Sequence, residues 1–288
     1  MNKLRDYLEL TKPRITLFVV LTGFVGFAAG LPGPLAQAKL PLLVHTLLGI
    51  AFVASGTSAF NQLCEIGLDS RMARTRNRPL PAGRLRPLQA GVFATTLAVA
   101  GLAELWIYTN PITTALAAAT LLSYVFAYTP LKTRSPIALL VGAVPGALPP
   151  LGGFTAAHGS IAPLGLALFL LLFLWQLPHF LAIGWRHRRD YHEAGFRILP
   201  ALDGDGTRTG HQALLYCVAL LPAALAPALL GATGPVYAVG ALLLTLVFLA
   251  AAHRFSRETT DAAALRLFLV SIAWLPAVLV LFVADRVW

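Results

Sequence analysis

The sequence predicts an all-α integral membrane protein, and three observations support this fold class. Apolar residues make up 57% of the 288 residues and charged residues only 12%, whereas soluble domains carry about 25% charged residues. Apolar stretches of about 20 residues, the length of a helix that crosses a bilayer, recur along the whole chain. Basic residues gather in alternate links between these stretches, as they do on the cytoplasmic side of membrane proteins.

About nine stretches are long enough to span a bilayer, and each should be helical because lipid offers no partner to unpaired backbone groups. They cover residues 15–32, 41–64, 88–108, 111–128, 137–157, 162–184, 211–231, 235–252 and 266–284. No internal repeat divides the chain, so residues 1–288 are expected to form a single transmembrane domain. The prolines of residues 142–153, "GAVPGALPPLGG", should kink or break the fifth span, which either shapes a groove or permits close helix packing.

The basic residues predict the topology. All of the 22 lysines and arginines except Lys39 and Arg286 lie at the N-terminus or in alternate links. This asymmetry predicts a multi-pass protein of a bacterial inner (plasma) membrane with a cytoplasmic N-terminus. It also accounts for most of the net charge of +10, so nucleic acid is not expected as a partner. The lipid bilayer is the expected partner. A cleaved signal peptide competes for the first 38 residues, but acidic Asp6 and Glu9 lie where such a peptide is basic.

The end of the second span carries three oxygen-bearing side chains at regular spacing. Asn61, Glu65 and Asp69 lie four residues apart, so on a helix they form one polar stripe. Acidic side chains in or at the edge of a membrane helix are costly and usually functional. Amide and carboxylate oxygens suit Mg²⁺, which keeps several waters and accepts phosphate oxygens. The stripe therefore predicts a Mg²⁺ site; the alternative is a polar cluster that only joins helices.

Six arginines follow the stripe between residues 71 and 86. If the helix continues, Arg71, Arg74 and Arg78 share one face, and Pro79 ends the helix near Arg78. Guanidinium groups bind phosphate through paired hydrogen bonds. Carboxylates beside arginines predict a metal–diphosphate site whose mouth lies on the cytoplasmic side. The alternative, that the arginines only set the topology, applies most to the last two.

Two further links on the same side carry charged side chains. Lys132 and Arg134 follow the fourth span, and Asp190 and Glu193 lie among arginines after the sixth. Loops that close over a diphosphate would exclude water and protect a reactive carbocation. For Asp190 and Glu193 the alternative is a solvated loop. His179, near the end of the sixth span, either contacts an iron porphyrin, takes part in a proton transfer, or is a hydrogen-bonded core histidine.

The cysteines add no site. Cys64 and Cys217 lie in different apolar stretches and do not have the spacing of metal ligands. A disulfide framework is therefore excluded, and both thiols are interpreted as packing residues.

Together these motifs resemble the UbiA-type intramembrane prenyltransferases, and within them the branch that farnesylates haem b. The pattern N-x-x-x-E-x-x-x-D-x-x-M-x-R-T-x-x-R-P-L at residues 61–80 is similar to the haem branch, whereas other branches usually carry an aspartate-rich version. The remaining matches are "LTKPRI" at 10–15, "YTPLKTRSP" at 128–136, "GAVPGALPPLGG" at 142–153, "WQLPHF" at 175–180 and "DYHEAGFRILP" at 190–200. The resemblance covers about residues 10 to 210.

The resemblance implies a farnesyl diphosphate donor, a Mg²⁺ ion, and haem b as a substrate whose vinyl group gains the farnesyl chain. A long apolar groove between the helices would hold that chain. The metal ligands implied are Asn61, Glu65, Asp69 and Asp190, and the diphosphate ligands are Arg74, Arg78, Lys132 and Arg134. Tyr128 and His179 match family positions without a defined role. A haem A synthase or an oxidase-assembly factor is the partner implied.

One departure from the family pattern concerns the second acidic motif. The family often has D-x-x-x-D there, whereas Asp190 and Glu193 are three residues apart. The role of Glu193 and the number of metal ions therefore stay open.

Two other functions would account for part of this pattern. A prenyltransferase with an aromatic acceptor, such as a quinone precursor, would share most of the site, but the Asn61/Glu65/Asp69 form of the motif argues against it. An ion-coupled transporter would place its charges near the bilayer midplane within inverted repeats. Here the acids lie at one face beside phosphate-binding bases.

Overall fold

The computed structural model describes residues 3–34 and 39–287, and within these ranges it is helical apart from the links and one isolated bridge between Thr233 and Arg286. The described residues include nine helices long and apolar enough to cross a membrane, as the sequence predicts. These are α2 (Pro13–Gly30), α3 (Leu40–Cys64), α5 (Pro87–Tyr108), α6 (Pro111–Leu122) continued by η2 (Ser123–Tyr128) and α7 (Thr129–Leu131), α8 (Ala138–His158), α9 (Pro163–Arg186), α12 (Thr207–Leu229), α13 (Pro235–Glu258) and α14 (Asp261–Ala284).

Proline marks where many of the long helices begin. The first or second residue of α2, α3, α5, α6, α9 and α13 is a proline, and its missing N–H costs nothing there because no helical carbonyl precedes it. Side chains cap the starts of α6 and α14: Asn110 Oδ1 accepts the N–H of Thr113 at 2.9 Å, and Thr260 Oγ1 accepts that of Ala263 at 3.2 Å. The six spans marked by proline begin within two residues of their predicted limits, whereas α12 and α14 begin at Thr207 and Asp261, four and five residues before the predicted starts.

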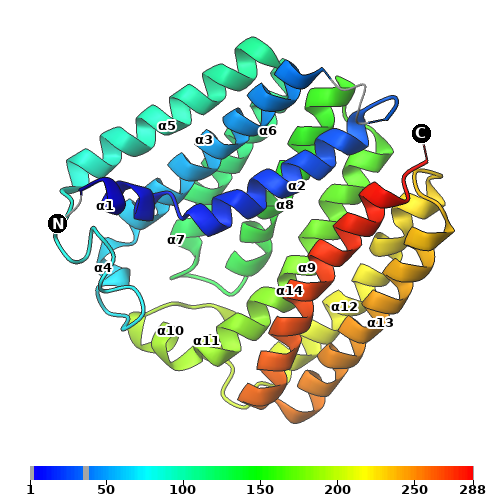
Figure 1. Ribbon diagram of the computed structural model, residues 1–288. Helices are drawn as coiled ribbons and strands as arrows, with labels where there is room; N and C mark the ends of the chain where they lie inside the picture. Colours follow the sequence, from blue (N-terminus) through cyan, green and yellow to red (C-terminus); the bar gives the residue numbers. More distant parts are fainter. Residues whose placement is uncertain (1–2, 35–38, 288) are drawn as a thin grey trace.

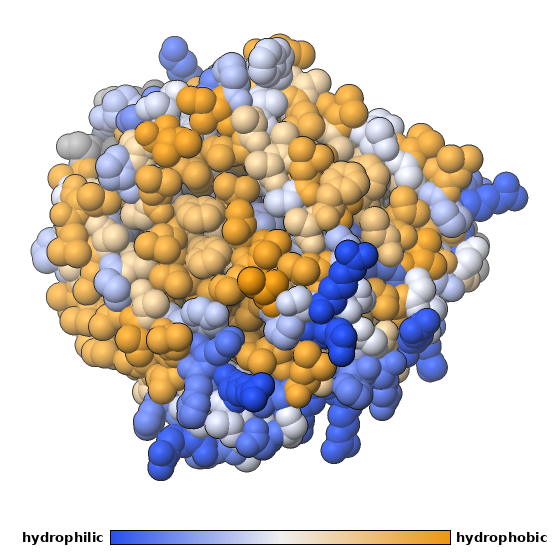
Figure 2. All heavy atoms as spheres, turned by 180° about the vertical axis from the view of Figure 1, so that it is seen from behind, coloured by the Kyte–Doolittle hydropathy of each residue, from blue (hydrophilic) through white to orange (hydrophobic). Residues whose placement is uncertain are grey.

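Four short helices lie together at one end of the bundle, which we call the polar end. They are α1 (Lys3–Leu10), α4 (Ile66–Asp69), α10 (Arg188–Ala194) and α11 (Leu199–Leu202). In Figure 1 the long helices run side by side towards this end, with α2 beside α3 and α8, and α9 beside α12 and α14. Figure 2 shows hydrophilic side chains gathered mainly along the polar end and a broad apolar surface above it.

Helices α2 and α8 pack backbone against backbone. A Cβ atom at Gly26 would lie 1.9 Å from the carbonyl oxygen of Pro150, and one at Gly153 would lie 1.9 Å from that of Gly23. The chain does not break at its prolines, because α8 is one helix from Ala138 to His158. Of the two alternatives for residues 142–153, close helix packing is the one that the structure shows.

Helix α6 passes into a π-helical segment before it ends. In η2, Ser123–Tyr128, the N–H of Thr129 bonds the carbonyl of Tyr124, five residues earlier. Pro130, which follows, has no N–H to donate, so the regular α-helical ladder is already interrupted at this point. Tyr124, Tyr128 and Lys132 all line the cavity described below.

We expect Gly153→Ala to destabilise the folded protein by about 1–3 kcal/mol, since the added methyl group would force α2 and α8 apart. The thermal midpoint in detergent measures this. Gly152→Ala is the matched control, because a Cβ there meets nothing within 4 Å. Equal stability of the two variants would contradict the close contact.

Candidate active site at the polar end

A cavity of about 280 Å³ opens at the polar end, between α2, α3, η2, α9 and the links beyond them. Its wall combines charged, aromatic and apolar side chains. The polar ones are Lys12, Asn61, Glu65, Asp69, Arg74, Thr75, Arg78, Tyr124, Tyr128, Lys132 and Tyr191. The structure therefore brings together residues from the N-terminus, the second span and three separate links.

Asn61, Glu65 and Asp69 lie on this wall, but not on one continuous helix. Helix α3 ends at Cys64, Glu65 has φ −102° and ψ 13°, and Asp69 ends the four-residue α4. The prediction that this helix continues to Arg78 is wrong, because residues 70–85 form turns. One contact marks the change: Thr75 Oγ1 donates to Asp69 O, six residues earlier, at 2.8 Å, a distance that a continuous helix would not allow. Hydroxyl bonds to the backbone of this kind compete with helical ones.

Each of the three oxygen-bearing side chains is buried and contacts a cation. Lys12 Nζ donates to Asn61 Oδ1 at 2.8 Å, and Arg78 Nη1 donates to Asp69 Oδ2 at 2.7 Å. Lys132 Nζ forms a salt bridge with Glu65 Oε1. The residues Asn61, Glu65 and Asp69 are 2%, 5% and 1% exposed, so their charges and dipoles need such partners.

The two lysines respond differently to burial. Burial, assisted by the positive charges of Arg78 and Lys132, lowers the pKa of Lys12 to about 8. Burial also acts to lower the pKa of Lys132, but Tyr128 and Glu65 beside it outweigh that effect and raise the pKa. The Lys132 ammonium group lies 4.5 Å from the centre of the Tyr128 ring, within the range of a cation–π interaction. Lys132 is thus held as a permanent cation.

Lys12 was not predicted as a site residue, because the sequence shows it only as one of the basic residues at the N-terminus and as part of the motif at 10–15. Lys12 precedes α2 with φ 48° and ψ 64°, a left-handed conformation that a non-glycine residue adopts at a cost of about 1–2 kcal/mol. This turn aims its side chain at Asn61, 49 residues further along the chain. Strained backbone held in place at a polar cavity is typical of functional sites.

Two contacts join the links over the cavity. Arg74 Nη2 donates to Tyr191 Oη at 3.0 Å, and its guanidinium carbon lies 5.4 Å from the centre of that ring. The backbone N–H of Arg197 donates to Lys132 O at 2.7 Å. Tyr191 was also missed, because nothing in the sequence indicates that it contacts an arginine 117 residues away. The expected closure of the three links is therefore present as direct contacts.

Several predicted site residues do not line this cavity. Arg134 and Glu193 are exposed, and the Asp190 side chain is 45% exposed with His187 Nδ1 at 3.9 Å. His179 faces α14, where its Nδ1 lies 2.7 Å from Ser271 Oγ. In the described part of the chain, no three His, Cys, Asp or Glu side chains group as metal ligands. The structure thus does not bring Asp190 to Asn61, Glu65 and Asp69.

The donor atoms at the cavity fit a hard divalent cation that is shared with a phosphate ligand. Asn61, Glu65 and Asp69 offer only oxygen atoms with which to bind it, and Mg²⁺ in such sites takes few protein ligands and completes its shell with water and phosphate. The basic side chains that now contact these oxygens suit the phosphate itself. A metal–diphosphate would let both sets of charges exchange partners within one cavity.

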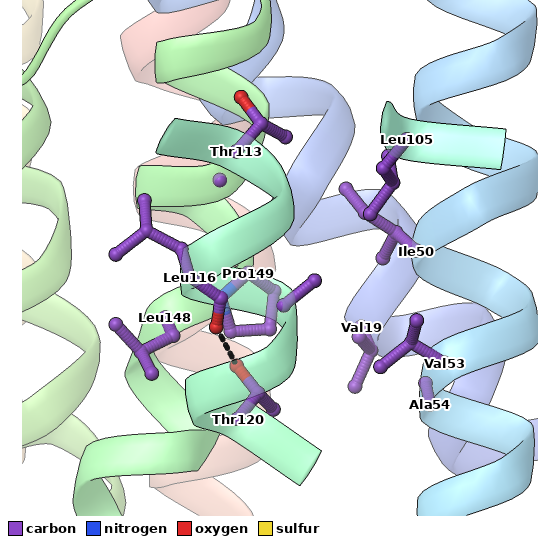
Figure 3. A pocket seen from close by; sticks show the side chains of 12 residues that line it. Val19, Ile50, Val53, Ala54, Leu105, Thr113, Leu116, Thr120, Leu148 and Pro149 are labelled. Atoms are coloured by element: carbon purple, nitrogen blue, oxygen red, sulfur yellow. Dashed lines mark hydrogen bonds between the residues drawn. The ribbon is translucent and has the colours of Figure 1, made fainter. Parts of the chain in front are cut away.

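A small apolar pocket of about 30 Å³ lies further from the polar end on several of the same helices. Figure 3 shows Val53 and Ala54 of α3 facing Leu116 and Leu148 across it. Ala54 precedes Asn61 by seven residues, about 10 Å along a helix, and Thr120 precedes Tyr124 by four. The apolar pocket therefore lies beneath the polar cavity on α3 and α6.

Comparisons with known proteins identify relatives of this chain in sequence and in fold. The sequence profile of the UbiA prenyltransferase family matches residues 17–277. The chain is similar to protoheme IX farnesyltransferases of Solibacter usitatus (44% identity, 98% of this chain and 99% of the relative) and Koribacter versatilis (39%, 98% and 94%). The fold is similar to that of a solved digeranylgeranylglyceryl phosphate synthase (TM-score 0.83, 19% identity, 99% of both chains). It is also similar to a UbiA homologue from Archaeoglobus fulgidus bound to GPP and Mg²⁺ (TM-score 0.71, 18%, 96% and 99%).

We expect Lys132→Met to destabilise the substrate-free protein by about 3–5 kcal/mol, because Glu65 would remain buried without its cation. The double variant Glu65→Gln with Lys132→Met should recover most of this loss, which thermal unfolding in detergent measures. Lys3→Met, at an exposed position, is the control. Additive losses in the double variant would show that the two side chains do not interact.

Proposed function

Because the chain belongs to the UbiA prenyltransferase family, we propose that it transfers a farnesyl group from farnesyl diphosphate to a vinyl group of haem b. The products are haem O and diphosphate. The observation that carries this proposal is the cavity where Asn61, Glu65 and Asp69 lie against Lys12, Arg78 and Lys132. Two relatives that match nearly the full chain are named for this reaction, and a homologue of the same fold binds GPP and Mg²⁺.

We assign the divalent cation, Mg²⁺, to Asn61, Glu65 and Asp69, with Asp190 as a further ligand that the links would have to bring in. When bound, the cation withdraws charge from the diphosphate and so helps it to leave. The basic side chains Lys12, Arg74, Arg78 and Lys132 bind the non-bridging oxygens and neutralise the charge that develops there. Arg134, at the rim, would join them only if its loop moved inward.

The proposed reaction balances as an addition across the vinyl double bond. The bond between C1 of the farnesyl group and the diphosphate oxygen breaks, and its electron pair leaves with the diphosphate. The vinyl group of haem b supplies the electrons of the new carbon–carbon bond. One water molecule then adds to the remaining cationic carbon and loses a proton, which gives the hydroxyethylfarnesyl side chain.

The links protect the allylic cation from premature capture by water. The Arg74–Tyr191 bond and the Arg197–Lys132 backbone bond hold them over the cavity, and exclusion of water is the recognised role of such closure. The rings of Tyr124 and Tyr128 line the same space, and their faces attract positive charge. We therefore give Tyr128 a role in stabilising the cation beside Lys132.

The farnesyl chain is proposed to run from the cavity towards the apolar pocket of Figure 3. That pocket is small, with a volume of about 30 Å³. A chain of three isoprene units can enter only if the helices that line the pocket move apart. The pocket lining is almost wholly apolar, so nothing there would oppose a hydrocarbon chain.

Orientation and partners belong to the same proposal. The polar end carries nearly all of the basic residues, which supports a cytoplasmic active-site mouth and N-terminus in a bacterial inner membrane. Haem O remains in the bilayer, so we propose delivery to a membrane partner such as haem A synthase or an oxidase-assembly factor. An aromatic acceptor in place of haem b would use the same donor site, and only the product distinguishes the two.

We expect Glu65→Gln and Asp69→Asn each to lower haem O formation at least about 100-fold, because each removes a charge that holds the metal–diphosphate. The assay combines haem b, farnesyl diphosphate and Mg²⁺ in detergent and identifies the product by mass. Glu258→Gln, in an exposed ion pair with Arg254, is the control. Full activity in either site variant would reject the metal role, and a wild type that forms no haem heavier than haem b would reject the haem acceptor.

Lys12→Met should raise the KM for farnesyl diphosphate by about tenfold or more, since it removes a charge-assisted hydrogen bond of about 1.5–3 kcal/mol. Arg14→Met, exposed and two residues further on, is the control. An unchanged KM in the Lys12 variant would mean that Lys12 only anchors Asn61.

A further inference from the structure

His179 on α9 is held in one orientation by a chain of hydrogen bonds that starts outside the diphosphate cavity. Its Nδ1 lies 2.7 Å from Ser271 Oγ on α14. Ser271 Oγ in turn donates to the carbonyl oxygen of Phe268 at 2.6 Å. A hydroxyl group has one proton, and a carbonyl oxygen can only accept, so the bond to Phe268 uses that proton. Ser271 must therefore accept from His179, which places the ring proton on Nδ1.

This tautomer leaves Nε2 of His179 with its lone pair. Among the described residues the structure gives Nε2 no hydrogen-bond partner, and the side chains around the ring are aromatic. A histidine that ligates a metal almost always donates its other N–H to a neighbouring acceptor, which fixes the ring and makes the free nitrogen more basic. The bond from Nδ1 to Ser271 has this form.

The surroundings of His179 suit a flat aromatic ligand. The His179 ring lies 4.9 Å from that of Trp175, 5.2 Å from Phe268 and 5.4 Å from Phe180, measured between ring centres. Trp175 is itself fixed, because its Nε1 donates to Ser271 O at 2.8 Å. Phe18 of α2 stacks on Trp175 at 6.1 Å. Three helices, α2, α9 and α14, thus meet at one aromatic face that includes a nitrogen lone pair.

This aromatic face adjoins the diphosphate cavity. Phe180, the residue after His179, lines that cavity together with Ile15 of α2. Both are exposed, Ile15 to 58% and Phe180 to 42%, so this part of the cavity wall lies at the outer surface of the helix bundle. A planar ligand anchored at Nε2 would extend along this wall with its edge directed to the cavity.

We propose that Nε2 of His179 is the axial ligand for the iron of the acceptor haem, and that the face between α2, α9 and α14 binds the porphyrin. The inference rests on the proposed function for the identity of the acceptor. The competing role is a core histidine that only joins α9 to α14. That role would require the hydrogen bond to Ser271 but not the free Nε2.

The test is titration of the purified protein in detergent with ferric and ferrous haem b, followed by absorption and electron paramagnetic resonance spectra. The wild type should show a histidine-ligated haem. His179→Gln, which can still donate to Ser271, should lose that spectrum and bind haem at least about tenfold more weakly. Added imidazole should restore the spectrum. Ser271→Ala should weaken haem binding about 10–100-fold, as loss of such an outer partner does.

Two controls separate ligation from packing. Metal-free protoporphyrin IX should bind the wild type and His179→Gln equally, because it lacks the iron that Nε2 would ligate. His253→Ala, at an exposed position on α13, should keep the wild-type spectrum. If His179→Gln showed the same haem spectrum as the wild type, the inference would be overturned. The proposed function would still stand as long as the wild type formed haem O. A wild type that neither binds haem b nor forms haem O would overturn both.

Discussion

The polar end depends on one electrostatic constraint, the neutralisation of oxygen-bearing groups that are buried at the end of α3 and in α4. Asn61, Glu65 and Asp69 are almost inaccessible to solvent, and each contacts a cation. Those cations come from three different places: the turn before α2, the residue after α7, and the link after α4. Neutralising the buried groups therefore also determines how three distant segments come together around the cavity.

The same pairing explains how the cavity can be stable without ligand and still bind a metal cation together with an anionic diphosphate. Without ligand, the lysines and Arg78 balance the carboxylates, so that no charge is buried alone. In the proposed function, a metal ion would bring positive charge to the carboxylates, and its diphosphate would bring negative charge to the lysines and arginine. Binding would thus replace one set of balanced contacts with another set made by the same side chains.

The sequence predicted the helices and part of the site for physical reasons that differ. Apolar length and proline positions are local, so the nine spans could be located from them. Asn61, Glu65 and Asp69 still lie on one wall of the cavity although α3 ends at Cys64, because α4 continues the chain for one more helical turn. The turns after α4 were not predicted, because the bond from Thr75 Oγ1 to Asp69 O, six residues earlier, replaces a helix that spacing alone would extend. Lys12 was missed because its role depends on a left-handed turn and on a contact 49 residues away.

The π-helical segment Ser123–Tyr128 changes the helical register of the residues that follow α6. A π-turn holds one residue more than an α-turn, so this segment acts as a single-residue insertion and rotates all that follows by about 100°. Lys132 follows this segment after the three residues of α7, and its Nζ pairs with Glu65. The direction of this counter-charge therefore depends on the number of residues in the helix that precedes it. A relative with one residue fewer in this helix would have to draw the counter-charge for its buried glutamate from another segment.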